Sequence, residues 1–525
     1  MGLRNAWETG ELRSILVAPQ HRPYDLFYTP KLARRDVWVA GRRCRKSALL
    51  MALHAETCIR TDGTQTAYVA PVERGIADYI RPILQVVFQS CPGDLLPTYS
   101  DKFNHLEFPD ESRIVFNGCN MRQYRYMRGQ KLGLATVDEM AEVDDLEAAV
   151  DDVLFPAVWD SHGRMVLSGT PPPVPSPDNP VMRYVETAKS GGAYWHSSVY
   201  ESEYTSNQIA EALRETSKGA IGERESYQIV ALCDPQSGLS IPAIYERAES
   251  LGISREALTV FLREFMAEFI RDENAVIVPE FIEKDHVLKA PYVHPVYYDM
   301  LYKASGADLG VADKTVQLYG VADFPRAKVV IEKEFSLQGA DVRTDIFADR
   351  HNDALRLLSW NNPKRQSFWS DNSNEMLLND LRALHNISIN ATDKEDKAEW
   401  LNLVRILLKN GAVEIDPSCT LLIATLNGAF WKDPLKKDYG RTHALGHMDA
   451  LDALIYLIRN LNRSGNPFPL NYNLQIGAVY DPVTTIYPQD WDKRAHTQEG
   501  KVLERIFDKS RYVKKPDTPS LMGGL

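Results

Sequence analysis

The stretch AGRRCRKS, residues 40–47, joins a strand-like run to a helix-like run and ends in the pair Lys46-Ser47. A loop between a strand and a helix offers backbone N–H groups to phosphate, its lysine reaches the terminal phosphates, and its hydroxyl binds Mg²⁺. The complete loop pattern has glycine at its first and sixth positions, which are Ala40 and Arg45 here. By itself, the stretch fits a phosphate site and a basic surface turn equally well.

Two later strand ends carry the side chains that such a site needs. The apolar run LATV is followed by Asp138 and Glu139, one carboxylate suited to Mg²⁺ and one suited to activating water. The run MVLSGT ends in residues 168–170, where a group that senses the γ-phosphate would lie. An acidic turn after a strand is common, but three such strand ends in this order predict an ATP-hydrolysing site.

A second group of carboxylates lies in the second half of the sequence. Asp308 ends the run YKASGAD, Asp371 ends SFWSD, and Asp449 and Asp452 lie three residues apart on one helix face. An acidic residue within the apolar helix ALDALIYLI is costly unless it is paired or binds a metal. Each aspartate alone fits a helix cap or a turn. Together they predict a site for two divalent cations that cleaves a phosphodiester.

Two residues near this group have other interpretations. His447 either assists the carboxylates or only flanks them, since a lone histidine is more often structural. Asp313 follows the first strand of this region and is interpreted as a turn residue.

Hydrophobic patterning predicts two α/β regions that position these residues. In the first half, short apolar strands alternate with segments long enough for helices, which predicts a parallel sheet covered on both faces. From Tyr302 onward, three strand-like runs precede alternating helices and strands, the order of an RNase H-like domain. We expect a P-loop ATPase core at 1–205, a helical lid or linker at 206–290, an RNase H-like nuclease domain at 291–463 and an irregular tail at 464–525.

The composition narrows the class of protein. A chain of 525 residues exceeds what one hydrophobic core usually serves, so we expect two or three domains. No run is long and apolar enough for a membrane span and the N-terminus lacks an apolar signal core, so we expect a soluble, non-secreted protein. The six scattered cysteines form no Cys-x-x-Cys pair, which argues against zinc and disulfides. The net charge of -11 argues against a uniformly basic surface but allows a local DNA-binding groove.

In combination, these motifs resemble those of the large subunit of tailed-bacteriophage terminase, from about Leu12 to Leu461. The segments that carry the resemblance are AGRRCRKS, VDEMAEV and LSGTP, followed by ADLG, SD and HMDALDAL. The resemblance implies a motor that uses ATP to pull concatemeric viral DNA through the portal into an empty prohead. It also implies a nuclease that cuts this DNA when packaging starts and ends.

The resemblance assigns roles to the candidates of the first group. The implied nucleotide-site residues are Gln20, Gly41, Arg42, Arg43, Arg45, Lys46, Ser47, Asp138, Glu139 and Thr170. ATP and Mg²⁺ are the implied ligands, with Ser47 and Asp138 on the metal and Glu139 as the base for water. Residues 168–170 would couple hydrolysis to motion, and Gln20 matches the position of an adenine-reading glutamine.

In the second group, the resemblance implies that Asp308, Asp371 and Asp449 are the catalytic metal ligands and that Asp452 is a weaker fourth ligand. The implied metals are two divalent cations, Mg²⁺ or Mn²⁺. The tail from Arg463 onward falls where members of the family contact the portal.

Arg45 departs from the family pattern, which usually has glycine there because the backbone approaches phosphate closely. Left-handed backbone geometry at an arginine costs roughly 1 kcal/mol, and phosphate contacts of Arg45 or of its neighbours would offset that cost. The family also carries arginine early in the loop. Arg42 and Arg43 are therefore candidates for an arginine finger that acts within the same chain.

The implied partners are double-stranded DNA, the portal protein and the terminase small subunit, with a homo-oligomeric ring, a pentamer, on the portal. The implied location is the host cytoplasm, with no membrane and no place in the mature virion. One alternative is a DNA helicase or translocase with an inactive nuclease domain. Another is a structural portal-docking or DNA-binding module with a degenerate ATP site. A transposase-like nuclease would share the carboxylates but leave the first half of the chain unexplained.

Overall fold

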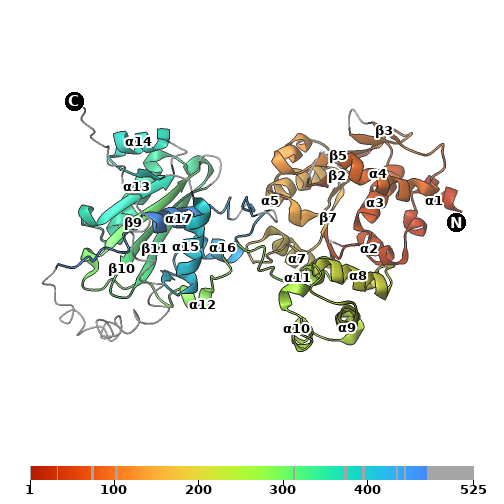
Figure 1. Cartoon of the computed structure of the whole chain (residues 1–525). Coiled ribbons are helices and arrows are strands. Elements are labelled where there is room, and N and C mark those ends of the chain that lie inside the picture. Colours follow the sequence, from red (N-terminus) through yellow and green to blue (C-terminus); the bar gives the residue numbers. More distant parts are fainter. Residues whose placement is uncertain are drawn as a thin grey trace, which may run out of the picture. The chain divides into compact units, whose positions relative to one another are not determined.

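The computed structural model describes residues 2–31, 33–71, 76–100, 104–310, 314–371, 375–392, 396–432, 436–442 and 445–469. The chain divides into two compact units: unit 1 is Met1–Val276 with Phe430–Ala444, and unit 2 is Ile277–Ala429 with Leu445–Leu525 (Figure 1). Asp313 and nearly all of the expected tail lie outside the described residues.

The division into units passes through the span expected for the helical lid or linker, 206–290. The helices of this span up to Glu264 belong to unit 1, and Ile277 begins unit 2. Unit 1 is also completed by a late segment of the chain. In this segment, the N–H of Trp431 donates to the carbonyl of Ala275 at 2.8 Å, and Lys432 pairs with Asp144 at 2.8 Å.

The described part of unit 1 is built on an eight-stranded sheet with the order β3-β4-β5-β2-β6-β7-β1-β8. Its strands are β1 (Arg35–Ala40), β2 (Gln65–Ala70), β3 (Thr98–Ser100), β4 (His105–Glu107), β5 (Arg113–Gly118), β6 (Leu134–Val137), β7 (Arg164–Gly169) and β8 (Tyr194–Ser197). β1 runs parallel to β7 and β8, and β6 runs parallel to β2 and β7. β1 leads into the AGRRCRKS loop, and β6 ends at the acidic pair. One strand, β7, lies between them, as in a P-loop NTPase fold.

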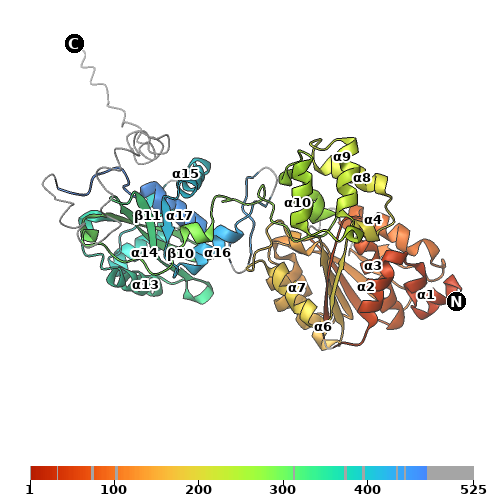
Figure 2. The ribbon, with the colours of Figure 1, turned by 90° about the horizontal axis from the view of Figure 1, so that it is seen from below.

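Helices cover both faces of this sheet. The α-helices described in unit 1 are α1 (Leu3–Thr9), α2 (Ala18–Tyr28), α3 (Lys46–Arg60), α4 (Ile76–Val87), α5 (Leu146–Ala149), α6 (Phe155–Asp160), α7 (Pro180–Ser190), α8 (Ser206–Thr216), α9 (Glu223–Cys233), α10 (Ile241–Ser250) and α11 (Arg255–Glu264). Figure 2 shows α2 and α3 on one side of the sheet and α6 and α7 on the other.

The alternation of side chains along β1 explains this double layer. Trp38 and Ala40 join a hydrophobic core with residues of α2 and α3. Val37 and Val39 join a separate core with residues of α6 and α7. Residues 37–40 are apolar in succession, so they point apolar side chains to both faces of the sheet. Such a strand is stable only when both faces are covered, and this fixes the α/β layering.

The described part of unit 2 is built on a six-stranded sheet with the order β13-β12-β9-β10-β11-β14. Its strands are β9 (Tyr302–Leu309), β10 (Thr315–Asp323), β11 (Lys328–Leu337), β12 (Gln366–Asp371), β13 (Asn390–Thr392) and β14 (Val413–Ile415). β9, β10 and β11 form an antiparallel meander, and β12 joins β9 in parallel. An antiparallel meander extended by parallel strands is the RNase H-like arrangement.

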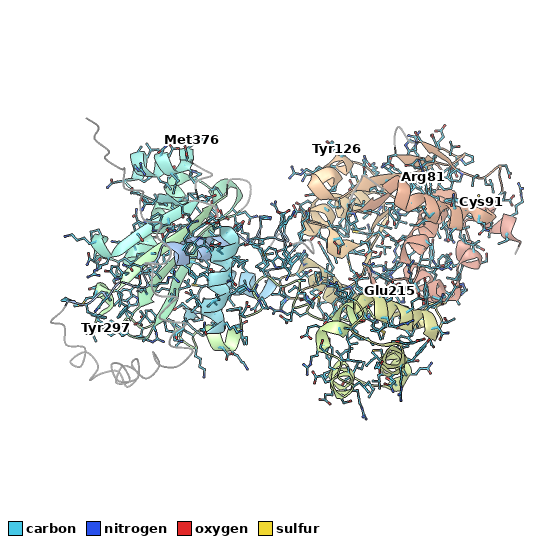
Figure 3. The ribbon with its side chains drawn as sticks, in the orientation of Figure 1. Arg81, Cys91, Tyr126, Glu215, Tyr297 and Met376 are labelled. Carbon is cyan, nitrogen blue, oxygen red and sulfur yellow. The ribbon has the colours of Figure 1, made fainter. Side chains whose placement is uncertain are left out.

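Helices also cover both faces of the second sheet. The α-helices described in unit 2 are α12 (Glu283–His286), α13 (Thr344–Leu357), α14 (Glu375–His385), α15 (Lys397–Lys409), α16 (Thr420–Gly428) and α17 (Asp449–Asn460). Ala307 and Leu309 of β9 pack in a core with residues of α13 and α14. Met376 projects from the opposite side of α14 and is 76% exposed (Figure 3). Within the described residues, no helix combines the length and apolar character that spanning a membrane requires.

Candidate nucleotide and nuclease sites

The loop between β1 and α3 has the backbone shape of a phosphate-binding loop. Arg43 and Arg45 adopt positive φ angles of 73° and 56°. The N–H of Gly41 donates to the carbonyl of Ser197 at 2.9 Å, and a Cβ added at Gly41 would lie 2.1 Å from the carbonyl oxygen of Phe265. Glycine is therefore required at position 41, while position 45 takes the left-handed geometry with an arginine.

Lys46 is buried at the first turn of α3, with 5% of its surface exposed. Its Nζ donates to the carbonyls of Ala40 at 2.8 Å and of Gly41 at 3.5 Å. The ammonium group thus lies over the loop that precedes it. This places a positive charge at the N-terminus of a helix, where an anion is favoured.

Asp138 follows β6 and is fully buried. Three hydroxyl groups donate to its carboxylate: Ser47 Oγ at 2.6 Å, Tyr68 Oη at 2.5 Å and Ser168 Oγ at 2.8 Å. These donors come from α3, β2 and β7, which the parallel sheet brings to one edge. The structure thus joins Ser47, Asp138 and Ser168 in one hydrogen-bonded group.

Glu139 lies beside this group in a left-handed conformation, with a φ of 52°. Burial raises the pKa of its carboxyl group, and the positive charge of Lys46 opposes this rise. A raised pKa suits a general base near neutral pH. A Cβ added at Gly169 would lie 3.1 Å from the backbone nitrogen of Met140, so the end of β7 lies against the turn that carries Glu139. Thr170 follows directly and is buried.

Gln20 contacts the loop. Its Nε2 donates to the carbonyl of Arg45 at 3.0 Å, and its Oε1 accepts from the N–H of Val17 at 3.0 Å. Two arginines of the loop are held by glutamates. Arg42 pairs with Glu264 at 2.8 Å, and Arg45 pairs with Glu203 at 2.7 Å.

Asp308 and Asp371 are brought together by strand pairing in unit 2. β9 and β12 run in parallel, with Ser370 opposite Ala307. The next residues along each strand are Asp371 and Asp308, which therefore lie side by side and point to the same face. Since Ala307 and Leu309 face α13 and α14, Asp308 points to the opposite face.

That opposite face carries α17. A Cβ added at Gly306 would lie 2.2 Å from the carbonyl of Ala453, so the helix crosses β9 at this glycine. Asp449 lies one helical turn before Ala453 and Asp308 lies two strand residues after Gly306, which are similar distances of about 6 Å. Asp449 also accepts the N–H of Lys314 at 3.3 Å, beside the end of β9. The structure thus places all three aspartates at one end of the sheet.

Asp452 is paired differently. Its Oδ2 accepts from Nζ of Lys397, at the start of α15, at 2.8 Å. This ion pair is one way in which an acid in an apolar helix is stabilised, and metal binding is not needed to explain it.

The donor types of both sites fit divalent cations. The hydroxyl of Ser47 and the carboxylate of Asp138 are oxygen ligands of the kind that Mg²⁺ prefers. The aspartates of unit 2 supply oxygen ligands as well. Among the residues that the structure describes, no three His, Cys, Asp or Glu side chains are grouped closely enough to hold a metal ion.

Sequence reasoning missed the partners of the expected residues. Tyr68, Glu203, Glu264 and Lys397 contact the sites through tertiary packing, and no local motif marks them. The one sequence signal that could have pointed to Tyr68 is its position within the apolar strand-like run QTAYVA, where its hydroxyl needs a hydrogen-bond partner.

Fold and sites together define a P-loop NTPase unit joined to an RNase H-like unit. No family model and no curated protein matches the chain. The solved structures that it is similar to are large terminases of bacteriophages.

Three of these structures illustrate the extent of the similarity. The large terminase of bacteriophage HK97 is 12% identical, with 84% of this chain and 94% of that chain covered and a TM-score of 0.48. The large terminase of a thermophilic bacteriophage, in complex with ATP-gamma-S, is 12% identical, with 84% and 97% covered and a TM-score of 0.34. The nuclease domain of the P22 large terminase is 15% identical, with 35% and 92% covered and a TM-score of 0.28. At this level of similarity, function has to be argued from the residues of the two sites.

Proposed function

We propose that the chain is the large subunit of a tailed-bacteriophage terminase. Unit 1 hydrolyses ATP to move double-stranded DNA through the portal into the prohead, and unit 2 cuts the concatemer. The observation that carries this proposal is the group around Asp138, which joins Ser47 and Ser168 beside Lys46 and Glu139. An RNase H-like sheet with aspartates at one strand end follows in the same chain.

In the proposed ATPase site, different residues bind the phosphates, accept the proton and hold the metal. Lys46 and the N-terminus of α3 bind the phosphates, and Glu139 accepts a proton from the attacking water. Ser47 and Asp138 would hold Mg²⁺, which neutralises phosphate charge when bound. Ser168 donates to the same carboxylate at 2.8 Å, so a change in the charge on Asp138 reaches the end of β7.

In the nuclease site, Asp308, Asp371 and Asp449 would hold two divalent cations. When bound, such ions would supply an activated water and would stabilise the leaving oxygen. The contribution of the chain is to fix three carboxylates on two neighbouring strands and one helix, so that the ligands come from rigid elements.

The partners of such a motor follow from its task. We propose that it binds double-stranded DNA, docks on the portal as a homo-oligomeric ring, a pentamer, and receives DNA from the small subunit. It would act in the host cytoplasm and leave the prohead before the virion matures.

ATP hydrolysis by the purified full-length chain tests the first activity. We expect Lys46→Ala and Glu139→Gln to lower turnover by roughly 100-fold or more, the range seen when a group that stabilises or activates a reacting centre is removed. Lys189→Ala, on the exposed surface of α7, is the matched control and should retain wild-type turnover. Equal turnover in all four proteins would exclude this ATPase site and favour a structural module.

Cleavage of supercoiled plasmid with Mg²⁺ or Mn²⁺ tests the second activity in the same full-length chain. Asp371→Asn should abolish cleavage and leave ATP turnover unchanged, whereas Asp380→Asn, on the exposed side of α14, should cut as the wild type does. A wild-type chain that hydrolyses ATP but never cuts DNA would support the alternative, a translocase with an inactive nuclease unit.

A further inference from the structure

The arginine in the sixth position of the phosphate loop is held by an ion pair. Arg45 has a left-handed backbone, and its carbonyl accepts the amide of Gln20 at 3.0 Å. Its guanidinium contacts the carboxylate of Glu203 at 2.7 Å. Both side chains are about half exposed, at 47% and 49%. The loop backbone and the side chain of Arg45 are thus held separately, the first by Gln20 and the second by Glu203.

Glu203 lies in the segment that follows β8, and this segment supports the loop at several points. Ser197 accepts the N–H of Gly41 at 2.9 Å, and the carbonyl of Ser198 accepts the thiol of Cys44 at 3.4 Å. A small pocket opens between the two segments. It is lined by Val17, Pro19, Arg43, Cys44, Arg45, Ser202, Glu203 and Tyr204. The Arg45–Glu203 pair lies in the wall of this pocket, beside the N-terminus of α3.

An anion bound at the start of α3 would compete with Glu203 for Arg45. Arg45 is the N-cap residue of α3, so its side chain starts at the N-terminus of the helix. A phosphate offers several oxygens and more negative charge than one carboxylate, and it pairs strongly with guanidinium. The existing pair is exposed to solvent and therefore weak. Phosphate can displace Glu203 at little cost.

We propose that Glu203 is a positioning residue that holds Arg45 away from the phosphates until a nucleotide binds. This inference rests on the proposed ATPase function of the same loop. It explains how the loop accommodates a side chain where the pattern has glycine: Glu203 neutralises and holds the arginine before nucleotide binds, and the nucleotide then recruits it. Glu203 thus lowers the affinity of the loop for nucleotide and makes the response to nucleotide depend on Arg45.

Calorimetric titration of the full-length chain with Mg²⁺ and ATP-gamma-S tests the inference. We expect Glu203→Gln to tighten binding by about two- to fivefold, the ratio that corresponds to an exposed ion pair. The same substitution should have no effect in an Arg45→Gly background, because its target is then absent. The gain should also shrink in high salt, which screens exposed charges. Glu203→Asp, which keeps the charge, should bind as the wild type does.

Glu211→Gln is the control. It removes the same charge from an exposed position of α8, and it should leave affinity unchanged. Thermal unfolding of each variant verifies that it is folded.

Three outcomes would overturn the inference. Unchanged or weaker binding by Glu203→Gln would show that the carboxylate does not compete with the nucleotide. Equal tightening in the Arg45→Gly background would show that Glu203 acts without Arg45. If the wild type, like Lys46→Ala, bound no ATP-gamma-S at all, the proposed ATPase function itself would fail and this inference with it.

Discussion

At the scale of single residues, Asp138 is the centre of the proposed ATPase site. Its buried carboxylate accepts hydroxyls from three different elements, Ser47, Tyr68 and Ser168. A buried polar group is tolerated only when hydrogen bonds satisfy it, and these hydroxyls supply such bonds. Asp138 and Glu139 are consecutive, but their environments differ. Asp138 is held as a ligand by donors, whereas burial raises the pKa of Glu139.

Tyr68→Phe should separate positioning from catalysis. The substitution removes one donor to Asp138 and keeps the buried ring, so the protein should remain folded. We expect the ATP turnover to fall by roughly tenfold or more, since a hydrogen bond to a charged group contributes about 1.5–3 kcal/mol and about 1.4 kcal/mol is tenfold in rate. Steady-state kinetics measure this effect, and Tyr99→Phe, whose hydroxyl bonds Asn104, is the control. Identical turnover in Tyr68→Phe and wild type would remove Tyr68 from the site.

The pH dependence of ATP turnover should report the pKa of Glu139. The base is active only when it is deprotonated, so turnover falls as the pH drops through its pKa. Because burial raises this pKa, the acid limb should lie above the value of about 4.3 for an ordinary glutamate. A profile of kcat against pH measures it. An acid limb at or below the ordinary value would contradict Glu139 as a buried base.

At the scale of elements, close backbone contacts decide whether the sites form. The loop after β1 is packed so tightly at Gly41 that no side chain fits. The same is true of β9 at Gly306, where α17 crosses the strand. Both glycines lie near the candidate site residues. Because they have no side chain, the backbone segments can approach closely, and this approach brings the candidate site residues together.

Gly306→Ala should therefore uncouple the two activities. A Cβ there would lie 2.2 Å from the carbonyl of Ala453 and 2.5 Å from the nitrogen of Leu457, so α17 must shift and carry Asp449 with it. We expect a loss of about 1–3 kcal/mol in stability and the loss of DNA cleavage, with ATP turnover retained.

Gly320→Ala is the graded control for this prediction. Its Cβ would lie 3.1 Å from a terminal carbon of Ile331 and from the carbonyl of Val330, so a smaller shift relieves the contact. Denaturant unfolding and plasmid cleavage measure both variants. Cleavage by Gly306→Ala at the wild-type rate would argue against the assigned position of Asp449.

At the scale of the whole molecule, each unit contains its own sheet and a buried histidine whose pKa is lowered by burial. His54 in unit 1 contacts the hydroxyl of Thr136 at 2.8 Å, and burial lowers its pKa to about 3. His351 in unit 2 contacts the hydroxyl of Tyr319 at 2.9 Å, and burial lowers its pKa to about 4. Both are therefore neutral in the folded chain near pH 7.

Acid should destabilise both units because of these histidines. An unfolded histidine binds a proton below about pH 6.5, whereas the folded ones bind one only at about pH 4 or below. Their stabilisation is therefore complete above about pH 6.5 and decreases as the pH falls toward the folded pKa values, by up to about 1.4 kcal/mol per pH unit for each histidine.

His351→Gln should reduce this pH dependence. Urea unfolding of wild type and variant at about pH 7 and about pH 5, on either side of the ordinary histidine pKa, measures it, with the partly exposed His385→Gln as the control. The expected result is a smaller difference in stability between the two pH values for His351→Gln alone. An unchanged difference would mean that other groups dominate the acid response.

The sequence by itself determined which residues face one another at the strand ends. Lys46 with Ser47, Asp138 and Asp371 all follow apolar runs, and the carboxyl ends of parallel strands meet at one edge of a sheet. The hydrophobic periodicity and the order of the strand-like runs along the chain therefore predicted both groups of candidate residues, because both can be read directly from the sequence. The short strands β3, β4, β13 and β14, each three residues long, carry too little pattern to be predicted.

Only the tertiary structure decided how those residues are held. Arg42 meets Glu264 across 222 positions of sequence, and Asp452 is paired with Lys397, 55 positions away. Such partners depend on how helices pack on the sheets, and no local pattern encodes that packing. Arg45 is a further example. The sequence showed that it departs from the loop pattern, but only the packing of the segment after β8 placed Glu203 beside it.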